Sequence, residues 1–213
     1  ATVLHVDAYF RPHNWIRIDA GTYLLADGQK YMLQGSEGIL PDSLFWMPDS
    51  GEASFVLKFG PLPRGTKSFD FIESDCDDCF KLYGVDLTGK KEYPRYPEGL
   101  PRALRKAPED GPVPEPILAV GTTTVNVRLL GYRRGMVKEV AMYVNSLLNG
   151  QEEHTAAIDP ESGTATLRFE QYGTVMAYVS CGPVFGMCWI APGETLDMYI
   201  AMEAGGRAVV QRR

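Results

Sequence analysis

The residue types best suited to chemistry are four cysteines, which form two local pairs, Cys76/Cys79 and Cys181/Cys188. The first pair is a C-x-x-C, the spacing of thiol–disulfide oxidoreductase sites, in which a helix N-terminus lowers the pKa of the reactive thiol. Here Asp75, Asp77 and Asp78 surround the two cysteines. Carboxylates disfavour a neighbouring thiolate and raise the pKa of its thiol. We therefore expect a structural or idle cysteine pair at this position, without redox catalysis.

The same cysteines are compatible with other arrangements. Four cysteines permit three disulfide connectivities, of which local pairing is one. Cys181 and Cys188 lie symmetrically about residues 183–186, so a hairpin that turned there would place them opposite each other, within reach of a bridge. A four-thiolate zinc site has enough ligands, but the six-residue spacer of the second pair argues against it. Cys76, Cys79, Cys181 and Cys188 are thus disulfide candidates, and we expect no metal or other cofactor.

The sequence contains no further catalytic motif. The three histidines lack zinc-protease spacing, and no P-loop, G-x-G-x-x-G or G-x-S-x-G is present. The net charge of −6 argues against a general nucleic-acid binder, because contacts to phosphate need clustered lysine and arginine. No apolar run approaches the roughly 18 residues of a membrane span. We expect a protein that is not an enzyme, binds no nucleic acid and has no membrane span.

Aromatic residues are the remaining candidates for binding. Phe45 and Trp46 lie in a loop with two prolines, residues 35–51. Large aromatic side chains usually cap hydrophobic cores, so we favour a role in which both residues plug the end of a β-sandwich. The alternative is a glycan- or ligand-binding face that uses Trp15, Trp46 and tyrosines, because sugar rings stack on aromatic rings. Phe45 and Trp46 are therefore the candidate ligand-facing residues.

Strand patterns dominate the first part of the chain. Residues 2–9 and 15–19 are rich in β-branched and aromatic types, and Asp27-Gly28 is a strong hairpin turn. Residues 54–59 alternate between apolar and polar types, and residues 68–72 would form a partner strand. We predict an all-β N-terminal domain over residues 1–93.

Residues 94–117 hold seven of the fifteen prolines in the chain. Proline removes a backbone donor, so this segment cannot be sheet interior, and we predict a linker with at most one short helix near residues 98–107.

Seven strand candidates follow, separated by turn signals such as Asn149-Gly150 and Pro192-Gly193. Residues 137–148 also fit a helical period, but their valines and the following Asn-Gly favour a strand. We interpret residues 205–213 either as an ordinary C-terminal tail or as the end of a fragment of a longer protein. The complete prediction is two antiparallel, immunoglobulin-like β-sandwich domains, residues 1–93 and 118–213, joined by the proline-rich linker.

Two parts of the chain resemble exported thioredoxin-like proteins of Bacteroidetes. They are residues 55–90 with YPEGLP at 96–101, and the segments LLGYRRGM, YVNSLLNGQEEHTAAID and CWIAPGETLDMYI. Such proteins look like chains with β-sandwich modules ahead of a C-terminal thioredoxin-like domain. The resemblance implies that these residues are the non-catalytic N-terminal portion of an exported protein, in the periplasm or at the cell surface, after removal of a leader.

No W-C-x-x-C follows a strand here, so any oxidoreductase activity would lie outside this chain. We expect a non-enzymatic accessory or interaction module of an exported cell-envelope protein, with a glycan- or ligand-binding β-sandwich module as the alternative. The partner would accordingly be a protein or a glycan.

Overall fold

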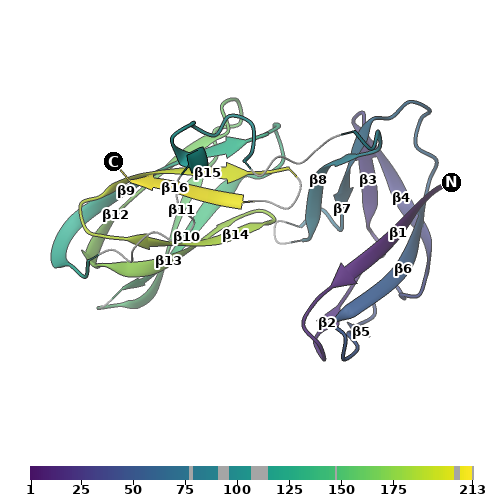
Figure 1. Ribbon diagram of the computed structural model, residues 1–213, viewed down its shortest axis with the longest axis horizontal. Helices are drawn as coiled ribbons and strands as arrows, with labels where there is room; N and C mark the ends of the chain where they lie inside the picture. The colour runs from purple at the N-terminus through teal and green to yellow at the C-terminus, as the bar shows by residue number, and fades with distance from the viewer. Residues whose placement is uncertain (77–78, 91–95, 107–114, 147, 204–206, 213) are drawn as a thin grey trace. The chain divides into compact units, whose positions relative to one another are not determined.

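A computed structural model describes residues 1–76, 79–90, 96–106, 115–146, 148–203 and 207–212. The chain divides into two compact units, Ala1–Lys91 and Glu92–Arg213. In the described residues, every regular element is a β-strand except one 3₁₀ turn, η1 (Leu104–Lys106). The prediction of an all-β fold is confirmed (Figure 1).

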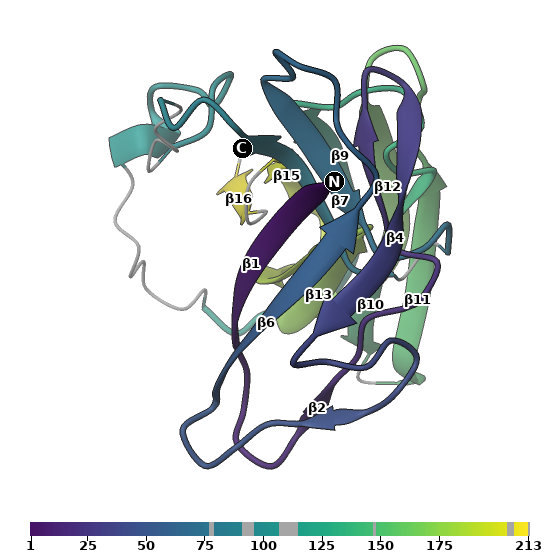
Figure 2. The same ribbon diagram turned by 90° about the vertical axis from the view of Figure 1, so that its right-hand side faces the viewer.

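Unit 1 is built on one six-stranded antiparallel sheet and a two-stranded ribbon. The sheet order is β1-β6-β4-β3-β7-β8, and the ribbon is β2-β5. The strands are β1 (Thr2–Tyr9), β2 (Trp15–Ile16), β3 (Tyr23–Ala26), β4 (Gln29–Glu37), β5 (Phe45–Trp46), β6 (Glu52–Phe59), β7 (Ser68–Ile72) and β8 (Lys81–Asp86). Figure 2 shows β1, β6 and β4 side by side.

Strand β4 joins the two halves of this sheet. Its first residues, 29–32, pair with β3, and residues 33–37 pair with β6, with a bulge between Leu33 and Gly35. The β3–β4 connection is the predicted tight turn: Asp27 and Gly28 both have positive φ, 49° and 75°, as a type I′ turn requires.

The core of unit 1 lies between the two halves. Leu24 of β3, Leu57 and Phe59 of β6 and Phe71 of β7 belong to one buried cluster. The rings of Phe59 and Phe71 meet edge to face, with centroids 6.3 Å apart. The predicted alternation of β6 is confirmed, because Phe55, Leu57 and Phe59 are all buried.

The expected pairing of residues 54–59 with residues 68–72 is wrong. Strand β6 lies between β1 and β4, whereas β7 lies between β3 and β8. The connecting segment includes Pro61 and Pro63, which offer no backbone donors for a tight hairpin. Instead the segment crosses from one half of the sheet to the other, with Leu62 packed on the core and its N–H donating to the Thr2 hydroxyl at 2.9 Å.

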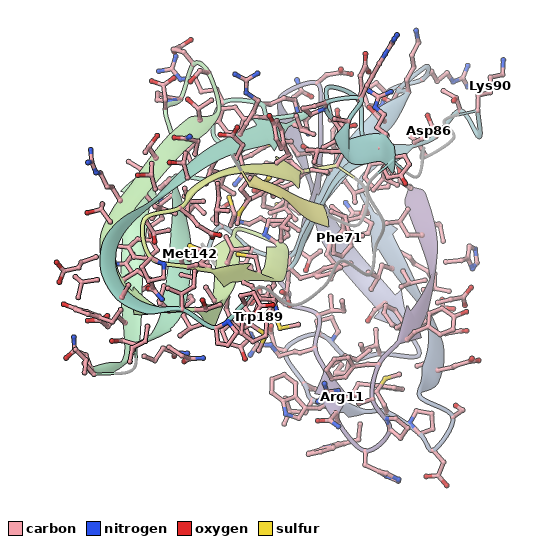
Figure 3. The ribbon with its side chains drawn as sticks, turned by 60° about the vertical axis from the view of Figure 1, so that its left-hand side comes forward. Arg11, Phe71, Asp86, Lys90, Met142 and Trp189 are labelled. Atoms are coloured by element: carbon pink, nitrogen blue, oxygen red, sulfur yellow. A yellow bond between two sulfur atoms is a disulfide. The ribbon has the colours of Figure 1, made fainter. Side chains whose placement is uncertain are left out.

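Unit 2 is a sandwich of two four-stranded sheets, β11-β10-β13-β14 and β12-β9-β15-β16. The strands are β9 (Leu118–Leu130), β10 (Glu139–Ser146), β11 (Gly150–Ala157), β12 (Thr164–Gly173), β13 (Val175–Cys181), β14 (Val184–Ile190), β15 (Thr195–Ala201) and β16 (Arg207–Arg212). Val127 of β9, Met142 of β10 and Met198 of β15 are buried, and Figure 3 labels Met142 within this unit.

Two parts of the domain prediction need correction in unit 2. Strands β9 and β15 pair in parallel, from Thr124↔Thr195 to Leu130↔Ala201, so the sandwich is not purely antiparallel. Its strand order also differs from the immunoglobulin constant domain, in which the first two strands are neighbours. The cause is the turn at Pro192-Gly193, which carries the chain from β14 into the opposite sheet beside β9. There the Thr124 N–H donates to the Glu194 carbonyl at 2.9 Å.

Part of the predicted linker packs on unit 2. Leu100 and Leu104 are buried and form a small apolar cluster with Leu130, so this part of the proline-rich segment contributes to the core. The segment considered for a helix or a strand forms β10, and the strand prediction is confirmed. The expected tail includes an eighth strand, β16, which pairs with β15.

The edges of the two sheets of unit 2 meet at a stacked pair of rings. His154 of β11 lies on Phe169 of β12 with ring centroids 4.2 Å apart and planes 6° apart. The Nε2 atom of His154 is buried and has no hydrogen-bond partner among the described residues.

Candidate functional site

Two tryptophans lie opposite each other on the β2-β5 ribbon. The register pairs Trp15 with Trp46 and Ile16 with Phe45. Paired residues of an antiparallel ribbon point to the same face, and successive residues point to opposite faces. Trp15 and Trp46 therefore share one face of the ribbon, and Ile16 and Phe45 share the other.

The two candidate aromatic residues consequently have different roles. Phe45 and Ile16 pack against the core cluster of unit 1, as expected for a plug. Trp46 projects into solvent with 61% of its surface exposed, and Trp15 beside it is 50% exposed. The favoured prediction of a plug therefore holds for Phe45 but not for Trp46, because neighbours in a strand face opposite sides.

Two more exposed rings lie at the point where β1 leads into the ribbon. Tyr9 ends β1, and Phe10 follows it with its N–H donating to the Gly51 carbonyl at 2.9 Å. The segments 9–16 and 45–52 thus run antiparallel beside each other, and we call them the aromatic ribbon. Figure 1 shows β2 and β5 beyond the ends of β1 and β6, and Figure 3 labels Arg11 on this extension.

The ribbon backbone is held at several points besides the two strand pairs. The Met47 N–H donates to the Asn14 carbonyl at 2.8 Å, and the His13 N–H donates to the Met47 carbonyl at 3.2 Å. The His13 imidazole lies 3.3 Å from an Asp49 carboxylate oxygen, with both side chains largely exposed. An exposed pair of this kind adds little stability, so these groups can exchange partners with a ligand at little cost.

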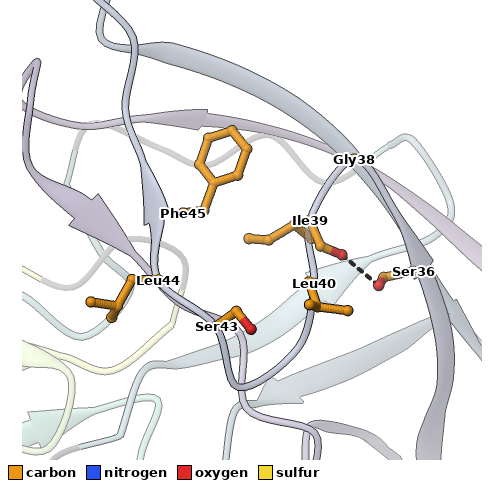
Figure 4. A pocket seen from close by; sticks show the side chains of 7 residues that line it. All are labelled: Ser36, Gly38, Ile39, Leu40, Ser43, Leu44 and Phe45. Atoms are coloured by element: carbon orange, nitrogen blue, oxygen red, sulfur yellow. Dashed lines mark hydrogen bonds between the residues drawn. The ribbon is translucent and has the colours of Figure 1, made fainter.

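An open depression of about 520 Å³ borders the ribbon (Figure 4). Its lining is apolar with two hydroxyls, from Ser36, Gly38, Ile39, Leu40, Ser43, Leu44 and Phe45. The Ser36 hydroxyl already donates to the Ile39 carbonyl at 2.6 Å. With no charged group in its lining, the depression offers shape and apolar contact but no acid–base chemistry.

A second exposed apolar surface lies on unit 2. Phe185, Met187 and Trp189 of β14 are 66%, 63% and 37% exposed, and they alternate with inward-facing residues. Their partners across β13 are Ser180, Tyr178 and Met176, and the rings of Tyr178 and Phe185 stack 5.9 Å apart. We call this surface the β13–β14 face. Residues 174–192 contain no charged side chain.

The Cys76–Cys79 disulfide is formed in the structure, with Cα atoms 5.4 Å apart. Its loop connects β7 to β8, and no helix begins among the residues of that loop that the structure describes. The neighbouring Asp75 accepts hydrogen bonds from Lys30 Nζ at 2.8 Å and Tyr23 Oη at 2.6 Å, and these bonds lower the pKa of Asp75. Asp77 and Asp78 lie outside the described residues.

The candidate bridge between Cys181 and Cys188 is not formed, and both keep their thiols. The β13–β14 hairpin turns at Gly182-Pro183, so Cys181 pairs with Val184 and Cys188 pairs with Ala177. The prediction placed the turn at residues 183–186 and is wrong, because a two-residue turn shifts the partner of each cysteine.

We expect the Cys181 thiol to resist alkylation in the native protein. Burial raises its pKa from 9.0 to about 12, which lowers the thiolate fraction about a thousandfold at neutral pH. The measurement is iodoacetamide labelling of the Cys188→Ser variant, followed by mass spectrometry, in native buffer and in denaturant. Cys181 should be labelled only in denaturant. Native labelling at the rate of an exposed cysteine would contradict this assignment.

In the part of the chain that the structure describes, no cluster of three or more His, Cys, Asp or Glu side chains is arranged around a metal position. Helices of the length and apolarity needed to cross a membrane are likewise missing from the described residues. Comparison of the chain with family models, curated proteins and solved structures finds no match. The resemblance to exported thioredoxin-like proteins stays a prediction.

Proposed function

We propose that this chain is a non-catalytic interaction module of an exported cell-envelope protein and the N-terminal part of a longer thioredoxin-like chain. The β13–β14 face carries the interaction role. An edge strand normally bears lysine, proline or a bulge that prevents association, whereas β14 presents Phe185, Met187 and Trp189 to solvent without a charge. An exposed, uncharged strand of this kind is typical of a surface that another protein covers.

The composition of this face fits a protein partner. Aromatic residues and methionine are enriched at protein interfaces, and methionine adapts to irregular apolar surfaces. A complete large side chain has a surface of about 150–250 Å², so the exposed fractions of Phe185, Met187 and Trp189 together offer roughly 350 Å². That area is in the range of functional patches on monomers but below the roughly 800 Å² per partner of a standard interface. A docked domain would therefore also cover Tyr178 and Met176 on β13.

Export is supported by the Cys76–Cys79 disulfide, because disulfides persist mainly in oxidising compartments. We propose that the partner that docks on the β13–β14 face is a thioredoxin-like domain, which the resemblance implies downstream of residue 213.

The first test is the full-length gene product. A thioredoxin-like domain after Arg213 is the expected result, and a natural stop there would overturn the proposal. The second test measures binding of the separately purified downstream domain to this chain. Met187→Glu should weaken binding about tenfold or more, because it places a charge in an apolar contact. Glu153→Ala on β11 of the same sheet is the matched control and should bind normally. Equal binding by both variants would exclude the β13–β14 face.

A further inference from the structure

We propose that the aromatic ribbon of unit 1 binds a neutral polysaccharide, with Trp15 and Trp46 as stacking surfaces for its pyranose rings. This site belongs to unit 1 and takes a sugar, whereas the β13–β14 face belongs to unit 2 and takes a protein. It assigns a second binding activity, one that does not depend on the protein interaction proposed above.

The geometry of the two indoles carries the proposal. Directly opposed residues of an antiparallel pair have Cα atoms about 4.5–5.5 Å apart, so the Trp15 and Trp46 side chains stand next to each other. Both rings are at least half exposed on the outer face. The electron-rich face of an indole attracts the polarised C–H groups on the flat side of a pyranose. Two neighbouring indoles can contact successive sugar units.

The ribbon is anchored before any ligand arrives. Ile16 and Phe45 fix its reverse face to the core, and backbone hydrogen bonds join the two segments on either side of the tryptophan pair. Binding then orders few additional groups, which favours affinity for a weakly interacting ligand such as a sugar chain.

The polar groups around the rings distinguish a sugar from other ligands. Arg11, His13 and Asp49 are exposed and lie within five residues of a ring-bearing position on the same segment. They supply hydrogen-bond donors and acceptors of both charge signs, which suits a neutral ligand rich in hydroxyls. A nucleic acid would call for clustered positive charge, and an apolar protein face would match an uncharged surface like that of β13–β14.

Titration with neutral hexasaccharides tests the proposal, with intrinsic tryptophan fluorescence and calorimetry as readouts. The panel comprises β-1,4-glucan, β-1,4-mannan, β-1,4-xylan and β-1,3-glucan fragments at millimolar concentration. We expect a fluorescence change and measurable binding with at least one fragment. Trp46→Ala and Trp15→Ala should each weaken that binding about tenfold or more.

Phe80→Ala is the matched control, because Phe80 is an exposed aromatic residue of unit 1 outside the ribbon. It should bind as the unchanged protein does, and circular dichroism should show all three variants folded. The proposal is overturned if no fragment binds, or if binding survives both tryptophan substitutions. Binding of anionic lipid vesicles or of an apolar peptide at the tryptophans, in place of every sugar, would overturn it as well. None of these outcomes bears on Met187, so the two proposals fail independently.

Discussion

Phe59→Ala is expected to lower the free energy of unfolding of unit 1 by about 4 kcal/mol, the largest effect among our predictions. Phe59 is fully buried at the end of β6 and contacts Phe71 edge to face. Truncation removes the apolar contacts of a whole ring and leaves a cavity in the centre of the cluster. Urea denaturation, followed by tryptophan fluorescence and circular dichroism, measures the change.

Phe80→Ala is the control for this experiment. Phe80 also meets Phe71 edge to face, with centroids 6.2 Å apart, but 54% of its surface is exposed. We expect its truncation to cost about 1 kcal/mol or less, because little area is withdrawn from water. If Phe59→Ala does not fold, Phe59→Leu should still fold and cost about 1 kcal/mol. Similar costs for Phe59→Ala and Phe80→Ala would show that the assigned core is wrong.

Gly51→Ala is expected to cost about 3 kcal/mol and to displace the aromatic ribbon. Gly51 has φ of +68°, and a Cβ atom there would lie 2.6 Å from the Phe10 carbonyl oxygen. That oxygen belongs to the backbone, so it cannot move without shifting the segment that leads to Trp15. Both the unfolding free energy and the near-UV circular dichroism of the tryptophans should change.

Gly28→Ala separates the two causes of this effect. Gly28 has φ of +75°, and a Cβ atom added there would have no other atom within 4 Å, so only the backbone conformation is penalised. We expect a cost of about 1 kcal/mol and an unchanged tryptophan spectrum. Equal costs at the two glycines would mean that the contact with Phe10 has no energetic weight.

Local patterns predicted the strands and tight turns well. The alternation in residues 54–59 identified the buried face of β6, and Asp27-Gly28 identified a turn through the φ values that it requires. Neither pattern contains information about which other strand pairs with a given strand. Alternation determines which face of the sheet a side chain occupies, but it does not determine the neighbouring strand. The predicted pairing of β6 with β7 was wrong for this reason. Strand β8 was missed because glycine and charged residues interrupt its apolar pattern.

The candidate site shows the same limit. Trp46 was identified as a candidate ligand-facing residue, and Trp15 entered the glycan alternative, but their direct pairing depends on a register between residues 31 positions apart (46 − 15). The sequence did not identify Phe10 as an exposed residue, because an aromatic residue at a strand end is equally typical of a core position. The β13–β14 face was missed because apolar residues occupy both faces of β14, so its sequence does not reveal which three face solvent.

The parallel pairing of β9 with β15 also affects how the chain can fold during its synthesis. Thr124 of β9 meets Arg168 on one side and Thr195 on the other, residues that follow it by 44 and 71 positions (168 − 124 and 195 − 124). At the usual synthesis rate of about 5–20 residues per second, the second partner appears roughly 4 to 14 s after Thr124. Throughout that interval one edge of β9 lacks the strand that will hydrogen-bond to it. The nascent chain is then most open to aggregation, and folding of unit 2 must wait for its last strands.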